Sequence, residues 1–164
     1  MVALLAASAG CGGGGGDETL QAVGGPGFGF SAPAGWEVEL RGRSSSATPE
    51  TGATELVSVR VFRLARPYRP ALWPSVEPEL DRVAADLARR LGGRIESSAV
   101  VVVDGRRAKR YDIRYERDGT EVVERTAFVL QGRREFQLVC RFEAEDGDEG
   151  RRACETLFST FRLA

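Results

Sequence analysis

The feature that most restricts the fold of this chain is a series of tight-turn dipeptides in its second half. Asp104-Gly105, Asp118-Gly119 and Gln131-Gly132 separate runs that are rich in valine and aromatic residues. Glycine supplies the positive φ that a tight hairpin turn needs, so each dipeptide predicts a turn between two antiparallel strands. The runs cover residues 95–103, 108–117, 121–130 and 135–142. We therefore expect a four-stranded antiparallel meander.

Two segments with helical spacing flank this meander. In residues 77–91 the apolar side chains on one helical face are Leu80, Val83, Ala84, Leu87 and Leu91. In residues 149–161 the corresponding side chains are Cys154, Leu157, Phe158 and Phe161. An amphipathic helix buries its apolar face against another element. We therefore predict a long helix before the meander and a C-terminal helix after it, both packed on the sheet.

The first half of the domain predicts shorter strands. Residues 27–31, 36–41 and 56–64 have the alternating pattern of strands, whereas the polar residues 42–52 predict a loop. Residues 66–74 contain three prolines and predict an irregular, exposed segment. The predicted fold class is α+β: an α/β/α sandwich with an antiparallel sheet of about six to seven strands, a long helix after the third strand and a C-terminal helix.

Composition excludes several classes of function. The chain has no histidine, a formal net charge of -1, and Lys109 as its one lysine. Without histidine it lacks the most common general base and the most common metal ligand. We predict no catalytic residue, no metal site, no cofactor and no enzymatic activity. A net charge near zero also gives no basic surface for nucleic acid, so we expect no nucleic-acid partner.

The N-terminal residues 1–11 have the features of an export signal. A short apolar run, Val2 to Ala7, leads into Ser8-Ala9-Gly10 and then Cys11. This order resembles the box of bacterial lipoproteins, in which the cysteine thiol receives a diacylglycerol. Ser8 stands where that box prefers leucine, and no basic residue precedes the apolar run; a start codon upstream of Met1 would explain the missing charge. An ordinary secretory signal with an incidental cysteine is the alternative.

The residues after Cys11 predict the domain organisation. Residues 12–25 begin with five glycines and resemble a flexible tether rather than part of a core. We therefore divide the chain into a signal peptide (1–11), a tether (12–25) and a folded domain (26–164). This organisation predicts an exported protein at the outer face of the cytoplasmic membrane or in the cell envelope, held to the membrane through a lipid on Cys11.

The order of elements also resembles a known family. The opening is Phe30-Ser31-Ala32-Pro33-Ala34-Gly35-Trp36, and the ending is Phe158-Ser159-Thr160-Phe161. Over residues 26–163 the chain resembles the PsbP-like family, in particular the small exported actinobacterial lipoproteins of the LpqN type. The resemblance implies the same sandwich fold and says almost nothing about function. Some family members are described with metal-binding histidines, and that property cannot be transferred to a chain without histidine.

Two cysteines remain once Cys11 is assigned to a lipid. Cys140 shares a strand face with Phe136 and Leu138, and Cys154 lies on the apolar face of the last predicted helix. Both faces point to the core, and an exported protein meets oxidising conditions. We predict a disulfide between Cys140 and Cys154; two buried reduced thiols are the alternative.

The sequence leaves three functions open. The first is a noncatalytic envelope protein that binds a protein or another envelope component. The second is a carrier of a small apolar or lipid ligand, which requires a cavity beneath the helix at residues 77–91. The third is an enzyme of unknown class, which requires that acids such as Asp81, Asp112 and Glu124 meet in a cleft.

Arginines at a spacing of three also raise the question of an anionic ligand. Arg63, Arg66 and Arg69 lie close in sequence to Tyr68 and Trp73. A lipid headgroup or polysaccharide could bind such a cluster. We favour the simpler interpretation, a solvated loop whose aromatic side chains rest on the edge of the sheet.

Overall fold

The structure is a computed structural model that describes residues 19–49 and 54–164, so the predicted leader, Cys11 and the start of the tether lie outside the described residues. The helices are α1 (Trp73–Arg90) and α2 (Asp148–Thr160), with a 3-10 turn η1 (Pro70–Leu72) before α1. The strands are β1 (Leu20–Gly25), β2 (Phe28–Pro33), β3 (Glu37–Arg41), β4 (Ser44–Thr48), β5 (Leu56–Tyr68), β6 (Arg94–Val103), β7 (Arg106–Arg117), β8 (Thr120–Glu143) and β9 (Arg162–Leu163). Within those ranges no helix is long and apolar enough to cross a membrane.

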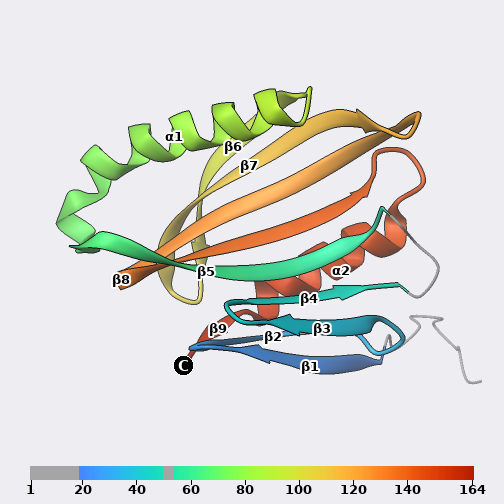
Figure 1. Ribbon diagram of the computed structural model, residues 1–164, viewed down its shortest axis with the longest axis horizontal. Coiled ribbons are helices and arrows are strands. Elements are labelled where there is room, and N and C mark those ends of the chain that lie inside the picture. The colour runs from blue at the N-terminus through green and yellow to red at the C-terminus, as the bar shows by residue number, and fades with distance from the viewer. Residues whose placement is uncertain (1–18, 50–53) are drawn as a thin grey trace, which may run out of the picture.

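The strands form two antiparallel sheets. The main sheet has the order β3-β4-β5-β8-β7-β6, and the small sheet has the order β1-β2-β9. Helix α1 lies along one face of the main sheet, and α2 lies between the main sheet and the small sheet (Figure 1). The predicted α+β sandwich with a long helix and a C-terminal helix is confirmed.

The meander is present, and its last hairpin lies inside β8. Strand β8 doubles back at Gly132, where φ is +54° (Figure 1). Its first arm pairs with β7 through residues 120–129, and its second arm pairs with β5 through residues 132–141. The backbone N–H of Ala144, just after the second arm, donates to the carbonyl of Glu121 at 2.9 Å. The two other turns have positive φ at both central residues, as a tight hairpin turn of this kind requires.

The larger part of the core lies between the main sheet, α2 and β2. Strand alternation buries Val57 and Val59 of β5 on this face, opposite Leu138 of β8. Phe28 of β2 packs beside Phe136 and Phe161 with ring centroids 6.2 and 6.3 Å away. This core fixes α2 and the small sheet on one face of the main sheet.

The other face of the main sheet carries α1. Its buried side chains Trp73, Leu80 and Ala84 pack on Tyr111 and Phe128. A second group, farther along the helix, consists of Ala88, Ile113, Tyr115 and Val122. Since these sheet residues belong to β7 and the first arm of β8, the helix covers only part of this face.

Polar contacts also attach α1 to the sheet. The Lys109 ammonium donates to Glu77 at 2.6 Å, and Glu77 also accepts from the Trp73 indole at 2.9 Å. The Tyr111 hydroxyl donates to Asp81 at 2.7 Å. Burial, with Asp81 as its acceptor, raises the pKa of Tyr111, so this hydroxyl remains a donor at neutral pH.

Two predicted boundaries were wrong because small residues form strands here. Residues 20–25, assigned to the tether, form β1, which pairs along its whole length with β2 and buries Val23. Residues 44–48, assigned to a loop, form β4, which lies between β3 and β5 and buries Ala47. Neither segment has the apolar alternation that identifies a strand from sequence. Each is stabilised as a strand by backbone hydrogen bonds to its neighbouring strands.

The segment at residues 66–74 was also predicted incorrectly. Strand β5 continues to Tyr68 after a shift of register beyond Arg63, and α1 begins at Trp73, with Pro74 in its first turn. Proline is tolerated there because its missing N–H has no helical partner. The long helix therefore follows the fifth strand of the chain rather than the third.

Candidate functional site

The three acids that an enzyme would have to bring together lie apart. Asp81 is on α1 and accepts from Tyr111, whereas Asp112 is on β7 and pairs with Arg125 at 2.8 Å. Strand alternation places Asp112 on the opposite sheet face from Tyr111. Glu124, on β8, pairs with Arg141. The structure thus provides no carboxylate pair from this set for acid–base chemistry.

Within residues 19–49 and 54–164, no three Cys, Asp or Glu side chains come close enough together to hold a metal ion. Glu149, an acid in the first turn of α2, has a local structural role, because its carboxylate accepts a hydrogen bond from the Trp36 indole at 2.9 Å.

A groove opens where α1 leaves the sheet uncovered, and we call it the α1 groove. It has a volume of about 400 Å³. From α1 it is lined by Val83, Asp86, Leu87 and Arg90, with Leu91 just beyond the helix; from the sheet it is lined by Leu56, Ser58, Arg60, Glu124, Gln137, Val139 and Arg141. This is the position that the carrier hypothesis requires, and a volume of this size is typical of small-molecule sites.

The inner wall of the α1 groove contains a buried charge pair. Glu124 is only 5% exposed, and its carboxylate lies 3.2 Å from the Arg141 guanidinium and 3.5 Å from the Tyr115 hydroxyl. Burial raises the pKa of Tyr115, which keeps that hydroxyl protonated. A buried carboxylate needs such partners, because an unpaired charge in this position would be strongly unfavourable.

The mouth of the α1 groove combines apolar and cationic side chains. Val83 is 49% exposed although it belongs to the apolar face predicted for the helix. Arg60 and Arg90 have no carboxylate within ion-pair distance in the described part of the chain, whereas Asp86 pairs with Arg89. The groove therefore has the chemistry to hold a small amphipathic molecule with an acidic group.

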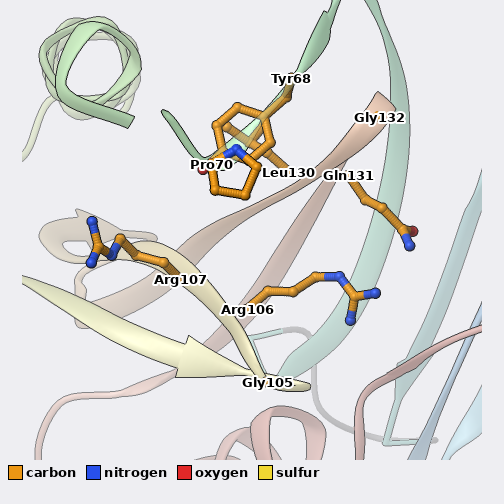
Figure 2. A pocket seen from close by; sticks show the side chains of 8 residues that line it. All are labelled: Tyr68, Pro70, Gly105, Arg106, Arg107, Leu130, Gln131 and Gly132. Atoms are coloured by element: carbon orange, nitrogen blue, oxygen red, sulfur yellow. The ribbon is translucent and has the colours of Figure 1, made fainter. Parts of the chain in front are cut away.

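A second hollow, of about 460 Å³, lies at the end of the sheet (Figure 2). It is formed by Tyr68 and Pro70 on one side and by the turns at Gly105 and Gly132 on the other. Arg106 in its wall is held by Asp104 at 3.1 Å. The side chains of Arg106 and Arg107 point in different directions (Figure 2), and Arg107 lies 5.6 Å above the Trp73 ring.

Of the three cysteines that were predicted as site residues, the structure describes two. Cys140 and Cys154 are fully buried and joined by a disulfide, with their Cα atoms 5.4 Å apart. Cys11 lies outside the described residues.

Of the residues that line the α1 groove, Glu124 was named from the sequence as a candidate acid, and Val83, Leu87 and Leu91 as part of the apolar helix face. The arginines Arg60, Arg90 and Arg141 were missed.

Comparison with known proteins identifies the fold. No family model and no curated protein sequence matches the chain. The structure is similar to the solution structure of cyanobacterial PsbP (CyanoP) from Synechocystis, with a TM-score of 0.63 and 16% identity, over 94% of this chain and 98% of that one.

Two further solved structures have the same architecture. One is LpqN of Mycobacterium tuberculosis, described as involved in cell envelope biogenesis, with a TM-score of 0.57 and 13% identity over 89% of this chain and 91% of that one. The other, from Bacteroides thetaiotaomicron, has a TM-score of 0.59 and 13% identity over 84% of this chain, which spans only 45% of its length. The chain therefore has the predicted PsbP-like fold; similarity at these identities establishes the fold alone.

Proposed function

We propose that this protein is an exported lipoprotein, anchored through Cys11, whose noncatalytic PsbP-like domain binds a protein or another component of the cell envelope. The observation that carries the proposal is the buried disulfide between Cys140 and Cys154. Structural disulfides form and persist in oxidising compartments. Because these two cysteines are partners of each other, Cys11 is left available for a lipid.

Two further observations support this function. LpqN, which has the same fold, is described as involved in cell envelope biogenesis. The acids Asp81, Asp112 and Glu124 are engaged by Tyr111 or by arginines, each with a partner of its own. A domain that folds these acids into structural contacts is better suited to binding than to acid–base catalysis.

The anchor is tested by metabolic labelling with a fatty-acid probe in a bacterium that lipidates exported proteins. We expect the wild-type chain to take up the label and to fractionate with membranes. Cys11→Ala should abolish both, whereas Cys140→Ala/Cys154→Ala should keep the label. Label retained in Cys11→Ala would contradict the assignment of Cys11.

The binding partner is accessible to site-specific photo-crosslinking in cells. A photoreactive residue at Val83 samples the mouth of the α1 groove, and one at Leu40, which is 66% exposed on β3, samples a distant surface. We expect a discrete adduct from position 83, to be identified by mass spectrometry. Identical adduct patterns from the two positions would argue against a specific partner at the groove.

The α1 groove favours a second candidate function, the transport or presentation of a small amphipathic ligand. Its position between helix and sheet and its apolar side chains support this role, as do the guanidinium groups of Arg60 and Arg90, which pair with no carboxylate among the described residues. Native mass spectrometry of the exported protein should then detect a bound small molecule. Val83→Trp, which fills the groove, should remove it, and Val102→Trp on the exposed edge strand β6 should not. Equal occupancy in both variants would exclude the groove as its site.

A further inference from the structure

A third concave surface, at the end of the sheet, is lined by four arginines, and we call it the arginine hollow. It has a volume of about 490 Å³. The arginines come from three separate parts of the chain: Arg43 before β4, Arg63 in β5, and Arg133 and Arg134 just after the turn of β8. Tertiary structure brings them together, and only Arg63 belongs to the arginine series seen in the sequence.

No acid among the described residues neutralises these four guanidinium groups. Within the described ranges, none of these arginines has a carboxylate at ion-pair distance, whereas Arg114, Arg125 and Arg141 elsewhere in the sheet are all paired. The acid nearest in register is Glu135, opposite Phe62. Strand alternation directs Glu135 to the other face of the sheet from its neighbour Arg134. The hollow is therefore a local concentration of positive charge on a chain whose net charge is -1.

Two of the arginines repel each other across the ladder. Arg63 and Arg134 are direct cross-strand partners in the pairing of β5 with β8, so their side chains project from the same face. Like charges directly opposite each other destabilise a sheet. An anion bound between these two arginines would convert the repulsion into two attractive contacts.

Arg134 is held in position by its surroundings. Its guanidinium lies 5.3 Å from the centre of the Phe136 ring and against the backbone of Gly27. A Cβ atom at Gly27 would lie 2.0 Å from the nearest guanidinium nitrogen, and Gly27 also has a φ of +83°. The absence of a side chain at Gly27 thus leaves the space that this guanidinium occupies, and a positioned side chain loses less entropy when a ligand binds.

We propose that the arginine hollow binds a phosphate group carried by an anionic ligand. Arginine presents a planar fork of donors that matches two oxygens of a phosphate, and it stays charged at any physiological pH. Pro26, which is exposed and also lines the hollow, provides an apolar surface for the part of the ligand next to the phosphate. This site is separate from the α1 groove, so the proposal does not depend on the function proposed above.

The first test is thermal unfolding of the full-length chain, with Cys11→Ser to prevent acylation and with the disulfide formed. The melting temperature is measured in increasing inorganic phosphate, with sodium chloride at matched ionic strength as the reference. We expect phosphate to raise the melting temperature in a saturable way by several degrees more than chloride does. Arg63→Gln/Arg134→Gln should lose this difference. Arg82→Gln/Arg94→Gln, which removes the same two charges elsewhere, should retain it.

The second test identifies the source of the phosphate. Sedimentation with vesicles of phosphatidylglycerol, but not phosphatidylcholine, would assign a lipid headgroup. A higher melting temperature in soluble glycerol phosphate, without sedimentation with vesicles, would assign a ligand outside the membrane. Either result supports the proposal if the Arg63/Arg134 double variant abolishes it. Equal effects of phosphate and chloride, or an unchanged response in that variant while circular dichroism shows it folded, would overturn the proposal.

Discussion

The charge of Asp112 is stabilised by a specific partner, Arg125, rather than by solvent. Asp112 and Arg125 form a two-point ion pair with contacts of 2.8 and 2.9 Å, and their side chains are only 13% and 21% exposed. Burial acts to raise the pKa of Asp112, but the hydrogen bond and charge of Arg125, together with the charge of Arg110, outweigh it and hold the pKa below its usual value.

Asp112→Asn should therefore make stability less dependent on pH. A carboxylate whose pKa is lowered in the folded state stabilises that state above its unfolded pKa of about 3.9, and this contribution is lost as the pH falls through the folded value. At pH 7 we expect the free energy of unfolding of the variant to be about 1–3 kcal/mol lower than that of the wild type. This loss lies between those typical of exposed and of buried ion pairs. Urea unfolding between pH 3 and pH 7 measures the difference, which should shrink below about pH 4.

The control for this prediction is Asp118→Asn. Asp118 is 92% exposed and makes only a 3.7 Å contact with Arg117. Asparagine also tolerates the positive φ of 52° at this position. Its effect should stay within about 0.5 kcal/mol at every pH. A difference for Asp112→Asn that is equally large at pH 3 and pH 7 would contradict the linkage argument.

At the level of the elements, the turns specify how the sheet pairs. The dipeptides at 104–105 and 118–119 have positive φ at both residues, and β8 reverses at Gly132. These conformations suit the right-handed twist of the strands that they join. Each of these turns therefore sets the register between strands that are adjacent in the sequence, without help from distant segments.

Gly119→Ala should destabilise the hairpin through backbone conformation alone. Gly119 has a φ of +82°, and a Cβ atom there would meet no atom within 4 Å, so no side-chain clash contributes. We expect a loss of about 1 kcal/mol in the free energy of unfolding, measured by chemical denaturation. Gly35→Ala is the matched control, because Gly35 also has open space and does not have a left-handed φ. The two variants should change the free energy of unfolding in different directions. Equal losses in both would contradict this explanation.

At the level of the whole molecule, the disulfide joins the main sheet to α2. Cys140 and Cys154 are separated by 14 residues and both are fully buried in the core beside Leu157. The cross-link closes the loop that contains residues 141–147 and the start of α2. It therefore restricts the unfolded chain in the region where the last helix must dock.

Removing the disulfide with Cys140→Ala/Cys154→Ala should lower the free energy of unfolding by about 3 kcal/mol, the value expected for a loop of this size. The wild-type protein should resist reductant under native conditions because both sulfurs are inaccessible, and it should be reduced once denaturant opens the core. Unfolding curves with and without reductant measure both effects. Rapid reduction of the native protein would show that this core is open to solvent.

The sequence predicted those parts of the fold whose causes are local. The turns of the meander, the face of α2 and the burial of both core cysteines follow from residues close together in the chain. It mispredicted β1 and β4, since glycine, serine and alanine form strands here only because β2, β3 and β5 provide the hydrogen-bonding edge.

The candidate sites depend on tertiary structure for a similar reason. The α1 groove exists because the helix packs on β7 and the first arm of β8, and leaves a hollow over β5 and the second arm of β8, at Leu56 and Val139. The arginine hollow exists because β5 and the second arm of β8 pair in a register that places Arg63 opposite Arg134. By itself, the sequence determined an α+β domain with an antiparallel meander, through turn chemistry and periodicity, and it placed two cysteines on faces that point to one core. Only the tertiary structure decided where its surfaces are concave and which charges meet there, because those properties arise between segments that are distant in the chain.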